Sequence, residues 1–460
     1  MSTNESSSQG QGQWQPAGID VLQPNSEGFG AATTRWNAYG APVFAKATVP
    51  GSAAEVAEIV KAARASEIPF LAMGGRHGYG HTFSQLQGGL AIDLRHLNSV
   101  AIDKTQETVT IGGGAKIRDV INPVADAGFQ IASGACNGAG YVGTTLGAGI
   151  GFLQGTFGLA LDALFKPGFV LGYSGAGANF GIVTSATYKL SKQINGGQVF
   201  YAELVYSAEQ QSAYFEMMEA YQDQRPAQLG CSSCIFWNPA TNSTCVLSTF
   251  IYVGTEEAAR SELQPFFDLN PVIAAAEDIP FQRVPNVILT GFAEVTCNTT
   301  EGIHSIHTVN VRKFTAATFS SVFTQFDAFL KQYEDARSAN SAIVIDNFGT
   351  AGPTSISDDS TAYPWRDAAC NVMLQMRWTG LDNPLGETAN TLAKKLRDEL
   401  AAKSGYDGLS AYVNYAWGDE TLEQIYRKDK LERLVALKKQ WDPANVFGYS
   451  NGIPPNYKTQ

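Results

Sequence analysis

Hydrophobic positions in the first part of the chain alternate between short apolar runs and stretches with helical spacing. Residues 69–73, 90–94 and 108–111 are apolar runs of strand length, and the first and last of them stop at consecutive glycines. Apolar residues repeat at helical spacing after Ser52-Ala-Ala-Glu55, where the serine and the glutamate fit a capping box, and again over residues 117–127. This alternation of strands and helices predicts an α+β or α/β unit.

After about residue 193 this pattern gives way to β-rich runs separated by amphipathic helices. The runs cover residues 199–205, 245–253 and 341–348. Helices are expected over residues 317–333 and 387–403. The pattern predicts a second domain with a mostly antiparallel sheet.

A last amphipathic helix is expected near the C-terminus, over residues 421–440. Its apolar side is formed by Leu422, Ile425, Leu431, Leu434 and Leu437. It is predicted to run unbroken and to stop at Asp442-Pro443, because proline cannot continue a helix.

Length and charge restrict the class of protein. At 460 residues the chain is too long for one ordinary hydrophobic core, so two domains are expected. The net charge of −11 argues against nucleic acid or an anionic membrane surface as a partner. No run of ~20 apolar residues occurs, so no membrane span is expected. None of these features determines the oligomeric state.

The N-terminal residues 1–15 are polar and lack both a positive start and an apolar segment. They indicate a disordered tail rather than a secretory signal, which favours an intracellular protein. Secretion stays the alternative, because Asn242-Ser-Thr and Asn298-Thr-Thr fit the glycosylation acceptor pattern.

Six cysteines are too few for a disulfide scaffold in a chain of this length. Cys231, Cys234, Cys245 and Cys297 cluster in the middle of the sequence. The Cys231-Ser-Ser-Cys234 pair has no second pair or βαβ context for zinc or redox chemistry. A structural disulfide with Cys245 and plain thiols are the two interpretations.

Glycine is concentrated in one stretch, residues 134–158, where nine of 25 residues are glycine. Bulky apolar residues such as Leu146 and Phe152 lie between the glycines, which disfavours a solvated linker. A better interpretation is that the backbone packs tightly against a large neighbouring group, because a side chain at the glycine positions would clash with it.

Glycine turns after strands often bring backbone N–H groups close to phosphate. The chain has no Walker A lysine, and neither Gly147-Ala-Gly149-Ile-Gly151 nor Gly175-Ala-Gly177-Ala-Asn-Phe-Gly181 has the Rossmann spacing. A nicotinamide dinucleotide on a Rossmann fold is therefore disfavoured. Several glycine turns spread along the chain suit a long ligand that lies across the domain.

A series of motifs in a fixed order resembles the PCMH-type FAD-binding domain of the vanillyl-alcohol oxidase superfamily. Within it, the chain is similar to the berberine-bridge-enzyme-like branch and to its fungal members of small-molecule biosynthesis. The motifs are Phe70-Leu-Ala-Met-Gly-Gly-Arg-His-Gly-Tyr-Gly80, Ala91-Ile-Asp-Leu94, Thr110-Ile-Gly-Gly-Gly-Ala115, Ser133-Gly-Ala-Cys136, Gly140-Tyr-Val-Gly143, Leu146-Gly-Ala-Gly-Ile-Gly151, Gly175-Ala-Gly-Ala-Asn-Phe-Gly-Ile-Val-Thr184, Tyr412-Val-Asn-Tyr415 and Trp441-Asp-Pro-Ala-Asn-Val-Phe447.

The resemblance implies an α+β fold with a two-part FAD-binding domain and a substrate domain whose large antiparallel sheet is flanked by helices. The expected division is a polar tail and lead-in over 1–35, the FAD-binding domain over 36–192, the substrate-binding domain over 193–410, and a C-terminal segment over 411–460 that returns to the FAD domain.

The resemblance also implies roles for single residues. His77 would bond the flavin 8α-methyl and Cys136 would bond flavin C6, which makes the FAD bicovalent. Asn414 would lie against the flavin, and Tyr412 would face the substrate as a possible base, with Tyr415 as the second catalytic candidate. The other expected cofactor-binding residues are Gly74, Gly75, Arg76, Gly78, Tyr79, Gly80, Gly134, Gly140, Val142, Gly143, Thr144, Gly147, Gly149, Gly181, Ile182 and Val183, and of these the turn from Gly74 to Gly80 would cradle the pyrophosphate. Arg76 stands where glycine is common in the family.

Each of these residues also has an ordinary structural interpretation. His77 lies between glycines with no apolar surface to pack on, which disfavours a merely structural histidine. For Cys136, the structural alternative is a free cysteine packed as a small hydrophobic residue. For Tyr412 and Tyr415, it is an aromatic residue half-buried on a strand. A tyrosine with a pKa of ~10 must have that pKa depressed, by a cation or by hydrogen bonds, to act as a base at neutral pH.

The other histidines rank lower as functional residues. His304 and His307 are spaced so that a strand places their rings on opposite faces, and no third ligand is near in the sequence, so a metal site is disfavoured. His81 and His96 are expected on the surface or in loops.

The sequence thus predicts an FAD-linked oxidoreductase, with O₂ as the expected acceptor, that oxidises an alcohol or an activated C–H bond of a small-molecule biosynthetic intermediate. Either Tyr412 or an acid of the substrate domain would take the proton. A carbohydrate oxidase of the same fold is the alternative: an open groove lined by aromatics would favour it, and a closed apolar pocket would favour the first hypothesis.

One segment departs from the family pattern. Relatives carry a β-hairpin and a short acidic helix before the turn at Gly175, whereas here only the nine residues 166–174 lead into it. We expect a shortened element that exposes a sheet edge. A non-catalytic flavin-binding relative is therefore the third alternative.

Overall fold

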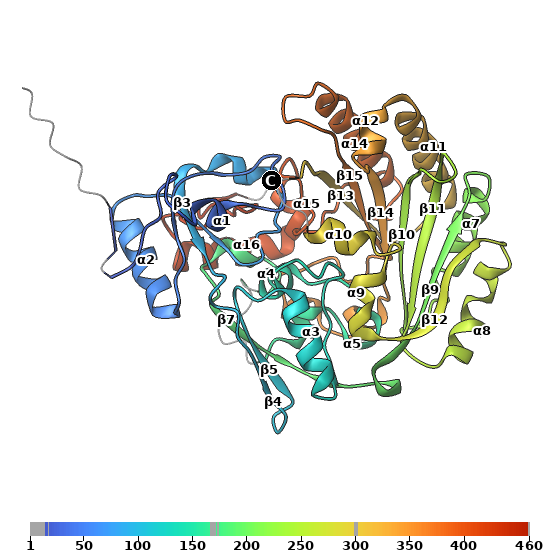
Figure 1. The fold of residues 1–460 in the computed structure, drawn as a ribbon, viewed down its shortest axis with the longest axis horizontal. Coiled ribbons are helices and arrows are strands. Elements are labelled where there is room, and N and C mark those ends of the chain that lie inside the picture. The colour runs from blue at the N-terminus through green and yellow to red at the C-terminus, as the bar shows by residue number, and fades with distance from the viewer. Residues whose placement is uncertain (1–13, 17, 166–171, 173, 299–301, 459–460) are drawn as a thin grey trace, which may run out of the picture.

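The computed structural model describes residues 14–16, 18–165, 172, 174–298 and 302–458. The tail predicted over residues 1–15 lies almost wholly outside the described residues, and so does most of the shortened segment 166–174. Within the described residues, the first part of the chain forms small sheets and the middle part forms one large sheet (Figure 1).

The small sheets belong to the part of the chain before residue 193. A parallel sheet has the strand order β1-β3-β2, an antiparallel sheet has the order β4-β5-β7, and β6 pairs with β8. The strands are β1 (Val43–Thr48), β2 (Phe70–Met73), β3 (Gln87–Asp93), β4 (Val100–Asp103), β5 (Thr108–Gly112), β6 (Phe129–Gln130), β7 (Ser185–Lys189) and β8 (Ser191–Lys192). The helices are α1 (Phe29–Thr33), α2 (Ala53–Ala65), α3 (Ile117–Asp126), α4 (Tyr141–Gly147) and α5 (Gln154–Phe157).

Helix α2 begins at the predicted cap. Ser52 Oγ accepts a hydrogen bond of 3.2 Å from the Glu55 N–H, but the Glu55 carboxylate reaches back to the Gly51 N–H (2.8 Å) rather than to that of Ser52. The apolar side of α2 packs on β2 and β3 in one buried cluster. The helix thereby supports β2, whose end leads into the first glycine turn, residues 74–80.

One large antiparallel sheet has the strand order β12-β9-β11-β10-β14-β15-β13 in the described chain. Its strands are β9 (Gln198–Tyr206), β10 (Leu229–Asn238), β11 (Ser243–Tyr252), β12 (Val272–Pro280), β13 (Ser305–Val311), β14 (Ala342–Asn347) and β15 (Cys370–Met376). The helices that accompany it are α7 (Gln211–Tyr221), α8 (Glu256–Phe267), α9 (Val284–Val287), α10 (Phe292–Asn298), α11 (Ala316–Gln332), α12 (Glu334–Ser338), α13 (Ala351–Thr354) and α14 (Leu385–Ala401). The predicted antiparallel sheet flanked by helices is confirmed, while the exact domain boundaries stay a prediction.

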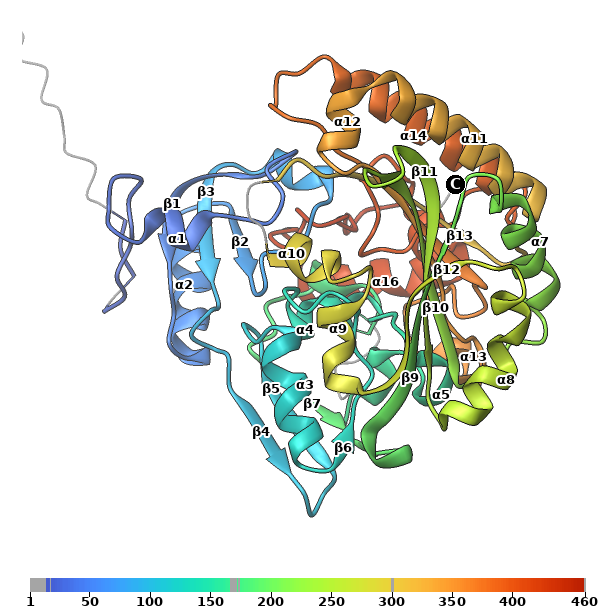
Figure 2. The same ribbon diagram turned by 45° about the vertical axis from the view of Figure 1, so that its right-hand side comes forward.

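The two faces of the large sheet carry different side chains. On β14, Ile343 and Ile345 are fully buried in the core under α7, α8, α11 and α14, whereas Val344 and Asp346 point to the opposite, inner face. Successive side chains of a strand alternate between faces, so one strand serves both the core and the inner face. Figures 1 and 2 show α7, α8 and α11 on the side of the sheet away from the first part of the chain.

The predicted C-terminal helix is broken into two, α15 (Leu422–Tyr426) and α16 (Lys428–Trp441). The break is at Arg427, whose φ of 64° lies in the left-handed region. Its guanidinium pairs with Asp358 and Asp429 and donates to Pro364 O (3.2 Å). Contacts with a distant segment thus override a helical pattern that carries no glycine or proline at this point.

The edge of the small antiparallel sheet is partly covered. Strand β7 is its edge, and Leu164 forms an isolated bridge with Tyr188 there. The Phe165 N–H donates to Thr187 O (2.8 Å). The residues just before the shortened segment therefore continue the sheet beyond β7.

Buried thiols account for most of the cysteines. Cys231, Cys234, Cys245 and Cys370 are free and buried, so for the pair in β10 the thiol interpretation is confirmed. Cys297 does not belong to this group, because it lies on α10. No helix among the described residues is long and apolar enough to cross a bilayer.

Candidate functional site

A cavity of about 440 Å³ lies between the glycine turns of the first part and the inner face of the large sheet. Its first wall is formed by the glycine turns and by residues 412–416. Its second wall is formed by side chains of β10, β14 and β15 and by α10. A long cofactor on the first wall and a substrate on the second would therefore share one space.

Glycine is required where the turns contact one another. A Cβ at Gly75 would overlap the backbone of Gly140, and a Cβ at Gly74 would overlap the carbonyl of Gly113. The tight packing predicted from the glycines is confirmed at these positions. The packed partner is the backbone of the neighbouring turn, so the turns hold one another in place.

The predicted cofactor-binding residues line this cavity with one exception. The residues at the cavity are Gly74, Gly75, Arg76, His77, Gly78, Tyr79, Gly80, Gly134, Cys136, Gly140, Val142, Gly143, Thr144, Gly147, Gly181, Ile182, Val183 and Asn414. Gly149 lies behind the wall, and its N–H donates to the Tyr412 hydroxyl (3.2 Å). Contact of these residues with a cofactor stays a prediction.

The Tyr412 hydroxyl is buried and accepts two hydrogen bonds, from the Gly149 N–H and from Asn414 Nδ2 (2.7 Å). Asn414 Nδ2 also donates to Thr144 O (2.8 Å), and a Cβ at Gly147 would overlap the Asn414 amide. Burial raises the pKa of Tyr412 to about 12 despite these hydrogen bonds. The depressed pKa that a tyrosine base needs is therefore not found, and Tyr412 holds Asn414 against the turn in its protonated form.

Asp346 on β14 is a buried carboxylate at the cavity. Ser232 Oγ donates to its Oδ1 (2.8 Å), and the Tyr415 hydroxyl donates to its Oδ2 (3.3 Å). Burial raises the pKa of Asp346 to about 6. The sequence predicts only an unspecified acid of the substrate domain at this place. The signal that points to this one is its place on the inward-facing positions of a strand.

Tyr79 and Tyr415 lie side by side at the cavity wall, with ring centroids 6.3 Å apart. Burial raises the pKa of both hydroxyls above the ordinary value for tyrosine. The Tyr79 hydroxyl is buried and has no hydrogen-bond partner among the described residues. A polar group of a bound molecule would satisfy it.

His77 packs against an aromatic ring, contrary to the expectation from its glycine neighbours. Its imidazole stacks on Trp36 with centroids 4.3 Å apart, and Trp36 stacks in turn on His304 at 3.7 Å. Burial lowers the pKa of His77 to about 4. At neutral pH the imidazole is therefore neutral and keeps a lone pair.

The remaining histidines are mostly packing residues. His307 stacks on Trp417 (5.1 Å) and shares a hydrogen bond with Asn390 Oδ1 (3.2 Å). His81 also stacks on Trp417, with centroids 4.7 Å apart, and is half-buried directly after the first glycine turn. His96 is exposed in a turn, as predicted.

Arg35 is a buried cation that no sequence motif marks. Its Nη2 donates to Gly78 O (2.7 Å), and its guanidinium lies 4.6 Å from the centre of the Phe83 ring. No carboxylate pairs with Arg35 within the described part of the chain. Burial lowers the pKa of Arg35 to about 10, which still leaves it charged at neutral pH.

Arg76, by contrast, is turned toward protein groups. Its Nη1 donates to Ala31 O and lies 3.8 Å from Asp93 Oδ2. Its φ of 59° lies in the left-handed region, which explains why glycine suits this position. The predicted role beside a pyrophosphate is better matched by Arg35.

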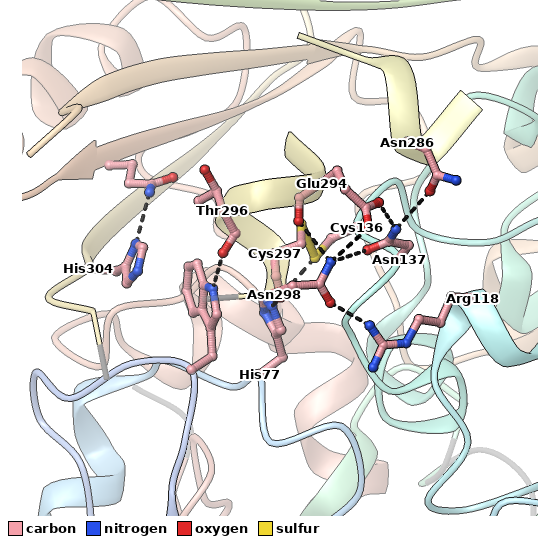
Figure 3. The surroundings of a disulfide bond; sticks show 12 residues. His77, Arg118, Cys136, Asn137, Asn286, Glu294, Thr296, Cys297, Asn298 and His304 are labelled. Atoms are coloured by element: carbon pink, nitrogen blue, oxygen red, sulfur yellow. Dashed lines mark hydrogen bonds between the residues drawn. A yellow bond between two sulfur atoms is a disulfide. The ribbon is translucent and has the colours of Figure 1, made fainter. Parts of the chain in front are cut away.

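Cys136 forms a disulfide with Cys297 of α10, which lies 161 residues later (Figure 3). Its Sγ also lies 3.5 Å from His77 Nε2, and that nitrogen donates a hydrogen bond of 3.1 Å to Cys297 O. A sulfur in a disulfide cannot bond flavin C6 at the same time. The predicted second flavin bond therefore conflicts with this state of Cys136.

Comparison with known proteins gives matches over nearly the whole chain. Residues 45–175 match the family model described as FAD binding domain, and residues 411–454 match the model described as Berberine and berberine like. The FAD-linked oxidoreductase srdI of Neurospora crassa is 39% identical over 453 residues, which cover 94% of this chain and 89% of that protein. The FAD-linked oxidoreductase OXR1 of Pyricularia oryzae is 36% identical over 94% of this chain and 88% of its own length.

Solved structures share the fold at lower identity. The BBE-like 1 protein of Physcomitrella patens superposes with a TM-score of 0.83 at 18% identity and covers 96% of this chain and 98% of its own. A glucooligosaccharide oxidase of Acremonium strictum, with a 6-S-cysteinyl, 8α-N1-histidyl FAD, has a TM-score of 0.81 at 20% identity, with the same coverage of 96% and 98%. At this identity the likeness shows the fold alone.

Proposed function

The chain belongs to the berberine-bridge-enzyme-like family of FAD-linked oxidoreductases, and we propose that it is an oxidase acting on an alcohol or an activated C–H bond of a small-molecule biosynthetic intermediate. FAD, when bound, supplies the hydride acceptor and passes two electrons on to O₂. The observation that carries the proposal is the hydrogen bond between the buried Asp346 and the half-buried Tyr415, which joins the two walls of the cavity at titratable groups.

The first wall fits FAD by its own chemistry. At Gly143 an added Cβ would meet nothing within 4 Å, so backbone is open to the cavity there. Arg35 offers a buried charge beside the first glycine turn. The Tyr79 hydroxyl, which has no hydrogen-bond partner in the described part of the chain, offers a polar contact. We assign Arg35 to the pyrophosphate, because a buried guanidinium without a carboxylate favours a phosphate oxygen. The neutral imidazole of His77 would form the bond to the flavin 8α-methyl.

The proton of the substrate would go to Asp346. With a pKa of about 6, this carboxyl is ionised at neutral pH and remains a stronger base than an exposed aspartate. It can accept the proton directly or through the Tyr415 hydroxyl, which donates to it. Tyr412, with a pKa of about 12, stays protonated and acts as a positioning residue for Asn414.

The second wall favours a substrate of low polarity. Its apolar lining residues are Cys234, Ile288, Leu289, Ala342, Val344 and Met373. A sugar ring needs many hydrogen-bonding groups. The polar residues of this wall are Ser232, Thr249, Thr296, Asn340, Asp346 and Gln375. Ser232 already bonds Asp346, Thr249 bonds Glu203 and Gln375 bonds His304, so few of these groups are left for a sugar. A carbohydrate oxidase, of the kind represented by the glucooligosaccharide oxidase, is therefore the second candidate and not the first.

The test uses the full chain as purified protein. An absorbance spectrum before and after acid precipitation shows whether flavin is bound and whether it stays with the precipitate. H₂O₂ release is then followed with a panel of benzylic and allylic alcohols and a matched panel of oligosaccharides. Turnover of the alcohols supports the proposal, and turnover of the oligosaccharides alone replaces it with the second candidate. A protein without flavin or turnover would be the non-catalytic relative.

A further inference from the structure

We propose that Cys136 is a redox switch with two mutually exclusive partners, Cys297 and the flavin. In the oxidised state the disulfide holds α10 against His77 and Cys136. In the reduced state α10 keeps only its hydrogen bonds to the first part of the chain, and Cys136 becomes free to bond the flavin. The proposal rests on the proposed function only in that the second partner is FAD; the disulfide and its effect on α10 concern this chain alone.

Helix α10 lies in the part of the chain after residue 193, but hydrogen bonds and the disulfide attach it to residues of the first part. Trp36 Nε1 donates to Thr296 O (2.8 Å), and His77 Nε2 donates to Cys297 O. The disulfide between Cys297 and Cys136 adds a covalent bond to these two hydrogen bonds. Both groups expected to anchor a flavin, His77 and Cys136, are thus occupied by the same residue of α10 (Figure 3).

Polar contacts continue the attachment beyond the disulfide. Asn298 accepts from Arg118 Nη1 (2.6 Å) and donates to Asn137 Oδ1 (3.3 Å). Asn137 Nδ2 donates to Asn286 Oδ1 (2.9 Å) and to the Glu294 carboxylate. Because α10 is only seven residues long, these contacts and the disulfide determine its place rather than its own helical stability.

The disulfide is placed where a thiol reductant can reach it. Cys136 and Cys297 are half-buried and both line the cavity, whereas the four free cysteines of the chain are buried. Thiol–disulfide exchange requires access to a sulfur, so Cys136–Cys297 is open to exchange from the cavity.

The chemistry of the switch balances in two steps. In the first, two molecules of a small thiol reduce the disulfide: the bond between the two sulfurs breaks, two S–H bonds form, and the small thiol leaves as its own disulfide. In the second, the Cys136 S–H bond and the flavin C6–H bond break and one C–S bond forms. The two electrons and two protons released go to O₂ as H₂O₂. Only the first step is needed to remove the covalent attachment of α10.

The experiment maps the state of Cys136 by mass spectrometry of non-reduced peptides. Wild-type full chain is prepared without and with dithiothreitol, beside Cys297→Ser and the control Cys245→Ser, which removes a buried thiol of β11. Flavin-free wild type prepared without reductant should give the Cys136 peptide linked to the Cys297 peptide. After incubation with FAD in air, the Cys136 peptide should shift to the flavin-carrying form in Cys297→Ser and in reduced wild type. Cys245→Ser should behave like unreduced wild type.

Two results would overturn the switch. One is a flavin-free, unreduced wild type without the Cys136–Cys297 peptide pair. The other is an equal amount of flavin on Cys136, zero included, in the reduced, unreduced and Cys297→Ser samples. If Cys297→Ser fails to fold, the comparison of reduced with unreduced wild type decides the question. Flavin on His77 is read from the same digests, so a failure of the proposed function appears separately from a failure of the switch.

Discussion

The Tyr415 hydroxyl donates a hydrogen bond of 3.3 Å to Asp346 Oδ2, and this bond connects the segment beside the glycine turns to the inner face of the large sheet. Asp346 is the only one of the two that is ionised at neutral pH, because burial raises the pKa of Tyr415 above its ordinary value and that of Asp346 only to about 6. The direction of proton transfer, toward the carboxylate, follows from this difference.

Asp346→Asn should lower turnover by about 10²–10⁴-fold, the usual contribution of a general base. The amide keeps the shape of the side chain: its oxygen can still accept from one of the Ser232 and Tyr415 hydroxyls, and its NH₂ group can donate to the other. Flavin content should therefore remain that of wild type. Stopped-flow reduction of the flavin under anaerobic conditions measures the effect directly. A variant that reduces its flavin at the wild-type rate would remove Asp346 from the chemistry.

The pH dependence of reduction should follow the same group. Since the pKa of Asp346 is about 6 in the folded protein, the base is present above that pH, and the rate should fall as the pH drops through it. A profile in Asp346→Asn without that inflection is the matched control.

Stability should change with pH in the opposite direction. The folded pKa of Asp346 is raised above its unfolded value of about 3.8, so the folded state binds more protons between these values. The contribution of this carboxyl to the free energy of unfolding should therefore decrease as the pH rises from about 4 to about 6. Urea unfolding of wild type and Asp346→Asn across this range measures the difference, which should favour the variant at the upper end.

Tyr412→Phe should destabilise the fold without changing the pH profile. It leaves the Gly149 N–H and one Asn414 donor without their acceptor, at a cost of about 1–3 kcal/mol. Chemical denaturation measures the loss. A shift of the kinetic pKa in this variant would instead identify Tyr412 as the base.

Gly147→Ala should disturb the site through Asn414. The added methyl group overlaps the Asn414 amide and should cost about 1–3 kcal/mol as overpacking, with loss of bound flavin. Gly30→Ala is the control, because a Cβ at Gly30 meets nothing within 4 Å. Equal thermal stability and flavin content of the two variants would contradict the packing of Asn414 on the turn.

Arg35→Gln should weaken reversible FAD binding by about 10–100-fold, the equivalent of one charge-assisted hydrogen bond. The measurement is a fluorescence titration of apoprotein in a His77→Ala background, where a covalent bond to His77 does not mask the affinity. Arg64→Gln, on the exposed last turn of α2, is the control. An unchanged dissociation constant would show that Arg35 serves the structure alone.

Much of the fold could be predicted because its signals are local. The cap at Ser52, the strands that end at glycines and the alternating runs of the second part each depend on neighbours within a few residues. The break at Arg427 could not be predicted in this way, since its cause is a pair of contacts that includes Asp358, far away in the sequence.

The site residues likewise divide into those marked by local motifs and those that depend on the folded chain. The glycine turns, His77 and Asn414 stand in motifs and were found from the sequence. Asp346 and Arg35 were not selected, because their importance comes from burial, which is a property of the folded chain. The bond from Cys136 to Cys297 spans 161 residues and could not be derived from spacing.

The alternation of faces on the large sheet has a consequence for how such enzymes diversify. On β10, β14 and β15 the residues that support the core, such as Ile343, and those that touch the cavity, such as Val344 and Met373, occupy separate positions of the same strands. Mutations at the cavity positions can accumulate without disturbing the packing on the other face. One scaffold can therefore evolve to accept new substrates while selection for folding acts on a different set of codons.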